Sequence, residues 1–201
     1  DELEKVTPER ALAHPTWKMG PKITVDSATL MNKGFEIIEA VRLFGVEPER
    51  IEVVIHRQSI IHSMVEYTDN AVLAQLAVPD MRSCISYALH YPHRGVAVIE
   101  RLDLTSVGSL SFFKPDTETF SLLALAYDAL RVGGTMPAIL NAANECAVGH
   151  FLRGEVGSFT DIFDLVGETV AEFSSSPNPS IDDIISADHE ARRAVERRLS
   201  L

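Results

Sequence analysis

The stretch Asp26-Ser-Ala-Thr-Leu-Met-Asn-Lys-Gly-Phe-Glu-Ile-Ile-Glu-Ala-Val-Arg-Leu-Phe44 carries the clearest helical pattern in the sequence. Its apolar residues recur at helical spacing, and Asp26 or Ser27 is a typical N-cap in front of them. Gly45 follows directly and is typical of a helix end. We therefore predict one helix from about residue 26 to residue 44, preceded by a short strand at residues 23–25.

One side of this predicted helix is polar and has the residue types of a ligand site. Thr29, Asn32, Lys33 and Glu36 fall there at helical spacing. The amides of a helix N-terminus suit an anion, and Ser27 adds a hydroxyl at that end. A carboxylate beside such groups suits a divalent metal ion that also contacts substrate oxygens. The alternative is a capped amphipathic helix with a Lys–Glu pair on a solvated face.

Gly34 lies in the middle of the same predicted helix. A glycine at such a position costs about 1 kcal/mol relative to alanine. Its presence indicates that some group approaches the backbone closely at this point.

The flanking sequence predicts a small sheet and a further helix. Residues 51–56, 60–67 and 71–76 are rich in β-branched residues, and Thr68-Asp69-Asn70 is a short turn between the last two runs. Those two runs should form a hairpin. Residues 81–90 read as a helix that ends at Tyr91-Pro92. A short helix is also expected within residues 1–13, where Thr7-Pro8 is a typical start.

From about residue 117 the pattern is helical almost throughout. Helices are expected at residues 119–132, 136–153 and 160–173, and one or two more at 181–201, with short loops that favour a bundle. The predicted fold class is therefore α+β, with a small mixed or antiparallel sheet and flanking helices followed by a helical bundle. The expected domains are a catalytic region at 1–90, a connecting segment at 91–116 and the bundle at 117–201.

Several other residues invite a functional interpretation. His14, Trp17 and Met19 lie in a loop at residues 14–22, which is either a packed surface loop or a lid over a ligand. His56 and His62 fall on adjacent predicted strands, where a lone histidine is usually structural. The segment Asn141-Ala-Ala-Asn-Glu145 is better explained as a buried helix contact. Cys84 and Cys146 form no CxxC pair and are expected to be reduced thiols.

The overall charge restricts the class of partner. Acidic residues outnumber basic ones by 29 to 18, which gives a formal net charge of -11. Nucleic-acid binders depend on clustered Lys and Arg, so this balance argues against that class. A small anionic substrate remains compatible with it. No apolar run approaches the roughly 20 residues of a membrane helix, and the acidic first residues do not open a signal peptide.

Five segments together resemble the second half of the 1-deoxy-D-xylulose 5-phosphate reductoisomerase family. They are His14-Pro-Thr-Trp-Lys-Met-Gly20, Val25-Asp-Ser-Ala-Thr-Leu-Met-Asn-Lys-Gly-Phe-Glu36, His56-Arg-Gln-Ser-Ile-Ile-His62-Ser-Met, Pro79-Asp-Met-Arg82 and Leu140-Asn-Ala-Ala-Asn-Glu145. The resemblance covers nearly the whole chain and favours the ligand-site interpretation of the polar helix face. Phe35 and Arg57 are minor departures from the family pattern.

The resemblance implies an NADPH-dependent and metal-dependent activity. The family converts 1-deoxy-D-xylulose 5-phosphate to 2-C-methyl-D-erythritol 4-phosphate in non-mevalonate isoprenoid biosynthesis. By this resemblance Glu36 would contribute to a Mg²⁺ or Mn²⁺ site, and Ser27, Asn32 and Lys33 would hold the phosphate end of the substrate. Lys33 and Glu36 would thus belong to the catalytic machinery.

The same resemblance assigns expected roles outside the helix. His14 would contact the substrate and take part in catalysis, and Trp17 and Met19 would form a flap over it. His62 would be a second histidine near the site. Gly20 and Met81 would lie near the nicotinamide half of NADPH.

One family feature is absent from the sequence. We find no GxGxxG-type nucleotide loop, and the family also carries two more acidic metal ligands before the residues seen here. Because the chain also starts without a methionine, we expect a piece of a longer enzyme that is inactive alone, and a homodimer in the bacterial cytoplasm or a plastid stroma. The alternatives are a related oxidoreductase with another substrate and a non-catalytic phosphate-binding or dimerisation module.

Overall fold

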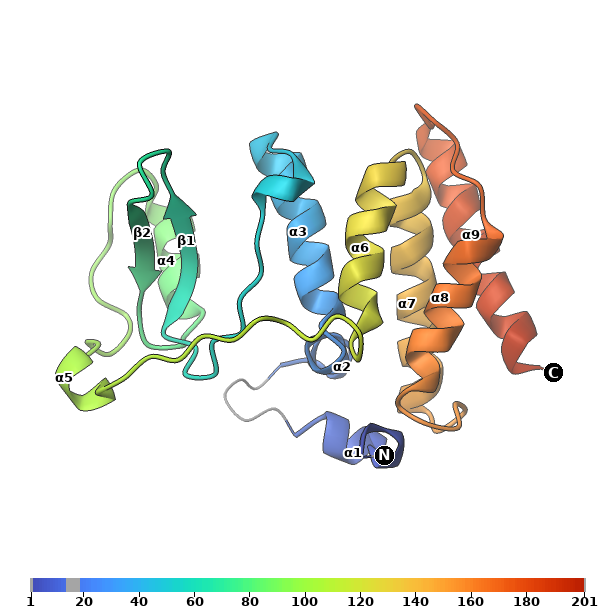
Figure 1. The fold of residues 1–201 in the computed structure, drawn as a ribbon, viewed down its shortest axis with the longest axis horizontal. Helices are drawn as coiled ribbons and strands as arrows, with labels where there is room; N and C mark the ends of the chain where they lie inside the picture. Colours follow the sequence, from blue (N-terminus) through green and yellow to red (C-terminus); the bar gives the residue numbers. More distant parts are fainter. Residues whose placement is uncertain (1, 14–18, 201) are drawn as a thin grey trace. The chain divides into compact units, whose positions relative to one another are not determined.

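The computed structural model describes residues 2–13 and 19–200 (Figure 1). The chain forms two compact units. Unit 1 combines Asp1–Val53 with Asp116–Leu201, and unit 2 is Val54–Pro115.

Unit 1 is a helical assembly centred on α7 (Met136–Leu152). Helix α6 (Ser121–Val132) lies between α3 (Met31–Phe44) and α7, and α7 also packs against α8 (Asp161–Glu172) and α9 (Ile181–Leu199) (Figure 1). Helix α7 is buried on most of its circumference, as expected for a helix that is apolar nearly all round. Its fully buried residues include Leu140, Ala143 and Val148.

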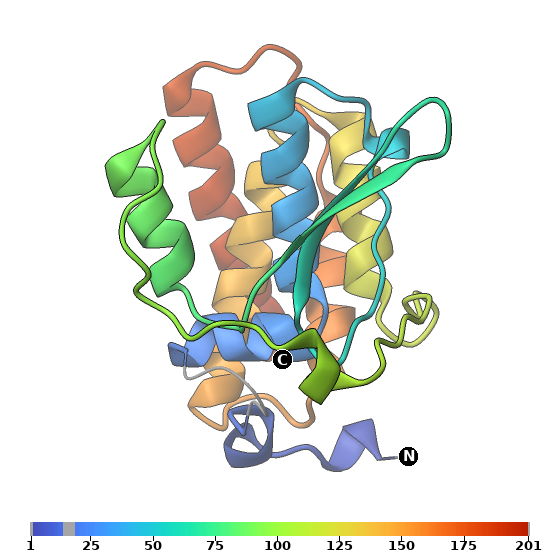
Figure 2. The same cartoon turned by 90° about the vertical axis from the view of Figure 1, so that its left-hand side faces the viewer.

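The N-terminal part of unit 1 differs from the predicted strand and single helix. Residues 23–25 belong to α2 (Pro21–Ala28), so the predicted strand is wrong. Pro21 at the first helical position favours the helix, and burial of Val25 outweighs the strand preference of a β-branched run. Figure 2 shows α2 running across the N-terminal end of α3.

The start of α3 was also wrongly placed by the sequence pattern. Leu30 adopts a left-handed conformation with φ 62° and separates α2 from α3, so that neither Asp26 nor Ser27 caps α3. The predicted end is confirmed, because Gly45 adopts φ 62° and its amide donates to the Val41 carbonyl.

The remaining predictions for unit 1 are confirmed to within a few residues. Helices α6, α7 and α8 match their predicted ranges, and residues 181–199 form the single helix α9, which starts with a Ser180–Asp183 capping box. The N-terminal segment forms a 3₁₀ turn η1 (Leu3–Lys5) and a short helix α1 (Pro8–Ala11), in which Thr7 caps Arg10. A second turn, η2 (Pro48–Arg50), follows α3.

Unit 2 contains the predicted hairpin. Strands β1 (Ile61–Glu66) and β2 (Val72–Leu76) are antiparallel, with Met64 opposite Ala74, and the Tyr67 amide donates to the Ala71 carbonyl across the turn at 2.8 Å. Helix α4 (Arg82–His90) is confirmed, and a one-turn helix α5 (Leu104–Val107) follows.

The third predicted strand, residues 51–56, is wrong. Only Ile55 forms a bridge, and its partner is Phe113 rather than a strand of the hairpin. The two backbone bonds of this bridge measure 2.8 and 2.9 Å. Residues 51–56 therefore belong to a connecting segment rather than to a strand of the sheet.

The α+β fold class is confirmed, but the compact units do not follow the expected domain boundary at residue 90. Helices α2 and α3 pack with the later helices because the apolar face of α3, including Met31 and Ile37, is buried there. Among the described residues, no helix combines the length and apolar character needed to cross a membrane.

Candidate functional site

The first two turns of α3 bring three polar side chains together. The Asn32 amide donates to Glu36 Oε1 at 2.7 Å, and the Lys33 ammonium bonds to Glu36 Oε2. The side chains of Lys33 and Glu36 are 41% and 47% exposed, so solvent and ligands can reach both. The face expected from the spacing is therefore present, with a cation, an amide and a carboxylate side by side.

This cluster can exchange its internal contacts for ligand contacts at small cost. An exposed ion pair contributes about 0–1 kcal/mol to stability. An anion could therefore take over the Lys33 ammonium and the Asn32 amide, while a cation takes over the Glu36 carboxylate. The start of α3 at Met31 also places the positive end of its helix dipole beside Asn32 and Lys33.

Ser27 occupies a different position from the one expected. It lies in the last turn of α2, and its hydroxyl donates to the Ile23 carbonyl at 2.8 Å. The prediction that Ser27 lies at the N-terminus of the site helix is therefore wrong, because that N-terminus lies about one turn further along the chain. The hydroxyl must rotate away from α2 to meet a ligand.

Leu30 joins the α2 segment of the motif to the α3 segment. A left-handed conformation is uncommon for a residue with a branched side chain, and such strain often accompanies functional sites. The turn at Leu30 fixes the direction in which α3 presents Asn32, Lys33 and Glu36. It is thus the local reason why one motif is divided between two helices.

A buried polar contact anchors α2 from behind. Asp26 is 2% exposed, pairs with Lys22 at 2.7 Å and accepts a hydrogen bond from the Asn144 amide at 2.8 Å. Ala142, Ala143 and Asn144 are fully buried, which confirms the predicted helix contact for the middle of residues 141–145, whereas Asn141 and Glu145 at its ends are exposed. The sequence interpretation missed the partner of Asn144. The available signal was a pair of polar residues within otherwise apolar helix faces.

Gly34 meets a helix rather than a ligand. A Cβ atom at this position would lie 2.8 Å from the Cβ atom of Ala126 on α6. The close approach predicted for this glycine is therefore present, but it serves the packing of α3 on α6.

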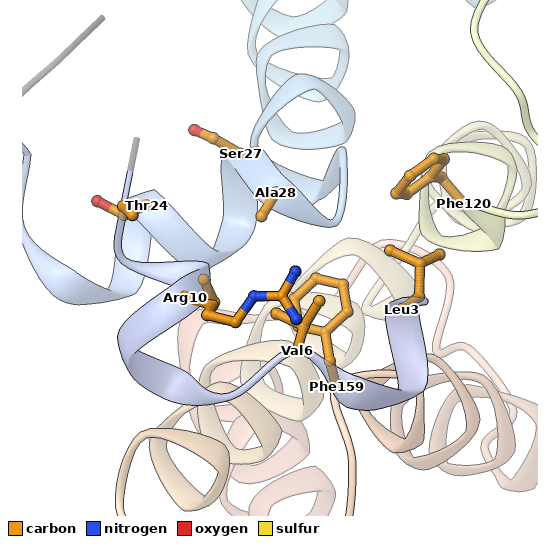
Figure 3. A pocket seen from close by; sticks show the side chains of 10 residues that line it. Leu3, Val6, Arg10, Thr24, Ser27, Ala28, Phe120 and Phe159 are labelled. Atoms are coloured by element: carbon orange, nitrogen blue, oxygen red, sulfur yellow. The ribbon is translucent and has the colours of Figure 1, made fainter. Parts of the chain in front are cut away.

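A mainly apolar cavity of about 350 Å³ lies between the N-terminal segment and α2 (Figure 3). The side chains of Val6, Phe120 and Phe159 line it, and Arg10 contributes a guanidinium. Ser27 and Thr24 also line it, but Figure 3 shows their hydroxyls turned away from Arg10, and both donate to carbonyls of their own helix. The cavity lining does not include the α3 cluster.

Two of the expected site residues belong to unit 2. His62 has Nδ1 3.1 Å from Gln75 Oε1 and Nε2 2.9 Å from the Ser59 carbonyl, so both ring nitrogens have partners. Met81 is 57% exposed at the start of α4. Beside it, hydrogen bonds from Arg82 lower the pKa of Asp80.

The other expected site residues lie before α2. Gly20 is the N-cap of α2 and has open space around it, and Met19 is partly buried. His14 and Trp17 lie outside the described residues. In unit 2, His56 is held by the Ser111 carbonyl at 2.9 Å and stacks on Phe112, which fits a structural role.

Curated relatives match the chain over nearly all of its length. The 1-deoxy-D-xylulose 5-phosphate reductoisomerase of Ralstonia pickettii is 55% identical over 100% of this chain and 50% of its own length. That of Caldanaerobacter subterraneus is 54% identical over 98% of this chain and 52% of its own length. The chain thus spans about half the length of the curated relatives that it matches.

Solved structures show the same relationship. The reductoisomerase from Zymomonas mobilis in complex with NADPH has a TM-score of 0.90 at 43% identity, covering 98% of this chain and 51% of that one. A DOX-P reductoisomerase in complex with NADPH, fosmidomycin and magnesium has a TM-score of 0.93 at 40% identity, covering 100% of this chain and 51% of that one.

Family models match two parts of the sequence. Residues 1–44 match the 1-deoxy-D-xylulose 5-phosphate reductoisomerase C-terminal domain, and residues 76–194 match the DXP reductoisomerase C-terminal domain. The second match alone covers more than half of the chain. The chain therefore belongs to the DXP reductoisomerase C-terminal domain family.

Proposed function

We propose that this chain supplies the substrate-holding and part of the metal-holding residues of a 1-deoxy-D-xylulose 5-phosphate reductoisomerase. The reaction would be the NADPH-dependent conversion to 2-C-methyl-D-erythritol 4-phosphate in isoprenoid biosynthesis. The observation that carries the proposal is the exposed Asn32–Lys33–Glu36 cluster at the start of α3. The names of the relatives and the ligands in the titles of the solved structures support it.

The chain's own residues divide the work by charge. Lys33 and Asn32 would bind the phosphate end of the substrate, assisted by the positive end of α3 and by the Ser27 hydroxyl once it leaves the Ile23 carbonyl. Such contacts hold the substrate in one orientation and reduce the entropy lost in the reaction.

Glu36 fits a Mg²⁺ or Mn²⁺ ion as one oxygen donor. Its side chain is 47% exposed, and hard divalent cations prefer carboxylate oxygens as ligands. Within residues 2–13 and 19–200, Glu36 belongs to no cluster of three metal-binding side chains, so the remaining donors would come from elsewhere. When bound, the ion would polarise oxygen atoms of the substrate.

Six further residues complete the proposal beyond the described cluster. His14 would contact the substrate, and Trp17 and Met19 would close over it and exclude water. His62 would act near the same substrate once one of its two ring nitrogens is released from its present partner. Gly20 and Met81 would contact the nicotinamide half of NADPH.

The decisive test compares two carboxylates on the same helix. Glu36→Gln should lower kcat by about 10²-fold or more, because the loss of one charged ligand removes several kcal/mol of stabilisation. Glu39→Gln removes the same charge one turn later and should leave kcat unchanged. Turnover of 1-deoxy-D-xylulose 5-phosphate is followed by NADPH absorbance with the intact protein that contains this chain.

The outcomes separate the rival functions. Unchanged metal-dependent turnover in Glu36→Gln would favour a non-catalytic phosphate-binding or dimerisation module. A folded wild-type protein that binds metal and NADPH but does not turn over this substrate would favour a related oxidoreductase with another substrate.

Lys33 can be tested through substrate affinity. Lys33→Met keeps most of the apolar stem and removes the charge, so KM should rise by about tenfold or more, in line with the loss of a charge-assisted hydrogen bond. Arg42→Met, in the last turn of the same helix, is the matched control. An equal rise in KM for both variants would contradict a specific role of Lys33.

We also propose that the protein is a cytoplasmic homodimer that associates through unit 2. The hairpin exposes large apolar side chains that a monomer seldom leaves in water. Among them are Met64, Val65, Leu73 and Leu76. Leu73→Lys should shift the sedimenting species from dimer to monomer, whereas Val132→Lys, at a similarly exposed position of the bundle, should not. A monomeric wild-type protein would contradict the proposal.

A further inference from the structure

The seam between α7 and α9 holds a second cluster of metal-binding side chains. Cys146 and His150 lie one turn apart on α7, and Glu196 faces them from α9. One ligand atom from each of the three lies within 4.8 Å of the other two. The proposed reductoisomerase function uses none of these residues.

The three donors form a combination that suits zinc. A thiolate, an imidazole and a carboxylate are the ligand types that Zn²⁺ takes in proteins. Magnesium and calcium, in contrast, prefer oxygen donors alone. Three protein ligands leave one tetrahedral position for water.

One ring nitrogen of His150 already has the kind of partner that supports a metal-bound histidine. His150 Nδ1 lies 2.6 Å from Glu155 Oε2, and Arg153 holds the same carboxylate oxygen at 2.9 Å. A carboxylate on one ring nitrogen fixes the ring and leaves the other nitrogen, Nε2, to bind a metal. This arrangement is the usual outer support of a zinc-bound histidine.

The surrounding charges and exposure allow a cation to enter. Glu196 is exposed and has no ion-pair partner in the described part of the chain, whereas the nearby Arg192 is neutralised by Asp188 and Glu145. His150 is 19% exposed. Burial raises the pKa of the Cys146 thiol, so the ion must displace its proton on binding.

The alternative is a packing thiol without a metal. Cys146 Sγ lies 3.7 Å from the Arg192 carbonyl, a weak contact that a buried cysteine commonly makes. That contact explains the position of the thiol, but it does not explain why an oriented imidazole and an unpaired carboxylate converge on it.

We propose that Cys146, His150 and Glu196 form a Zn²⁺ site that links α7 to α9. The ion would join His150 on α7 to Glu196 on α9, which lie 46 positions apart in the sequence. The same seam is also held by apolar packing and by the Arg192–Glu145 ion pair. Zinc should therefore stabilise the folded bundle, and the stabilisation should grow as the free zinc concentration rises above the Kd.

Cobalt replaces zinc with an optical signal that reports the thiolate directly. Titration of the untagged, reduced protein with Co²⁺ should produce a sulfur-to-cobalt charge-transfer band, and Zn²⁺ should abolish it. Cys146→Ser should lose the band, while Cys84→Ser, which removes the other free thiol, should retain it. A metal bound only at Glu36 would give no such band, so failure here leaves the proposed function intact.

Two further variants keep the test decisive if Cys146→Ser folds poorly. Glu196→Gln removes a surface ligand and should weaken Co²⁺ binding by about tenfold or more, and Glu155→Gln, which loosens the support of His150, should weaken it by about tenfold. Excess Zn²⁺ should raise the melting temperature of the wild type by a few degrees and that of Glu196→Gln by less. Absence of the band in the wild type, or its persistence in Cys146→Ser, would overturn the proposal.

Discussion

The two units of the chain bury their apolar residues to very different extents. Unit 1 contains a continuous core in which Leu122, Leu140 and Val166 are inaccessible to solvent. Within residues 54–115, all of which the structure describes, Ile60 is the single apolar residue in the buried class. Leu89, Tyr91 and Val96 in the same unit are 79%, 72% and 83% exposed.

This difference indicates separate sources of stability. The hydrophobic effect acts on surface removed from water, so the bundle carries its own driving force for folding. Unit 2 has a hairpin, a helix and local hydrogen bonds but little core, and an isolated hairpin is marginal in water. Unit 2 therefore gains little stability from burial within itself, and the proposed dimer would add cover on its hairpin.

Two leucines give the largest expected contrast between the units. Leu140→Ala should lower the free energy of unfolding of the bundle by about 3 kcal/mol, because it removes a fully buried side chain and leaves a cavity. Leu89→Ala, in unit 2, should change the free energy of unfolding of the chain by less than about 0.5 kcal/mol. Urea unfolding followed by far-UV circular dichroism measures both values.

A large loss in Leu89→Ala would break the comparison. It would mean that the exposed face of α4 is covered in solution. Repeating the measurement at several protein concentrations would then show whether a second copy provides that cover.

The buried Asp26 gives the next contrast. Asp26→Ala leaves the Asn144 amide without its acceptor and should cost about 2 kcal/mol of stability. The loss of a fully buried ion pair would cost more, but Lys22 is 39% exposed. Asn144→Ala should cost a similar amount. The double variant should lose less than the sum of the two in the same unfolding experiment. Strict additivity would show that the contact carries no energy of its own.

Local sequence signals predicted the helices of the bundle well. The glycine after residue 44 and the apolar spacing of α6 to α9 act within a few residues of the positions they define. The exposed face of Asn32, Lys33 and Glu36 followed from the same helical period. These features needed no knowledge of distant contacts.

Features that depend on distant packing were missed. Leu30 adopts a conformation typical of glycine, and no local signal marked it as the break between α2 and α3. Burial of Val25 turned a strand-like run into a helix. The Asp26–Asn144 contact joins residues 118 positions apart, and the resemblance of both segments to one family did not reveal that they touch.

Gly34 tests how closely the candidate site depends on the bundle. Gly34→Ala improves helix propensity by about 1 kcal/mol but forces the new Cβ against Ala126, which overpacking data place at about 1–3 kcal/mol. The net result should be a loss of about 1 kcal/mol in thermal or urea unfolding. Adding Ala126→Gly should restore the space and recover part of the loss. A loss without recovery would show that it does not arise from the contact between residues 34 and 126.

Two capping carboxylates give the smallest and most local contrast. Asp103 accepts hydrogen bonds from the Thr105 hydroxyl, the Ser106 hydroxyl and the Thr105 amide, which lower its pKa from 3.8 to about 2. Because the folded-state pKa is depressed, the contribution of Asp103 is complete above pH 3.8 and is lost as the pH falls towards 2. In the bundle, Ser180 lowers the pKa of Asp183 in the same direction.

Carbon-detected NMR titration of the two carboxyl groups measures both midpoints. Ser106→Ala should raise the Asp103 midpoint towards 3.8 and leave that of Asp183 unchanged, because each carboxylate is governed by its own cap. Acid should also speed amide exchange in α5 before it affects α7, since α5 is one short turn with no buried residue. If amide exchange in α5 and α7 accelerated at the same pH, the two units would unfold together. The difference in burial between the units would then have no matching difference in stability.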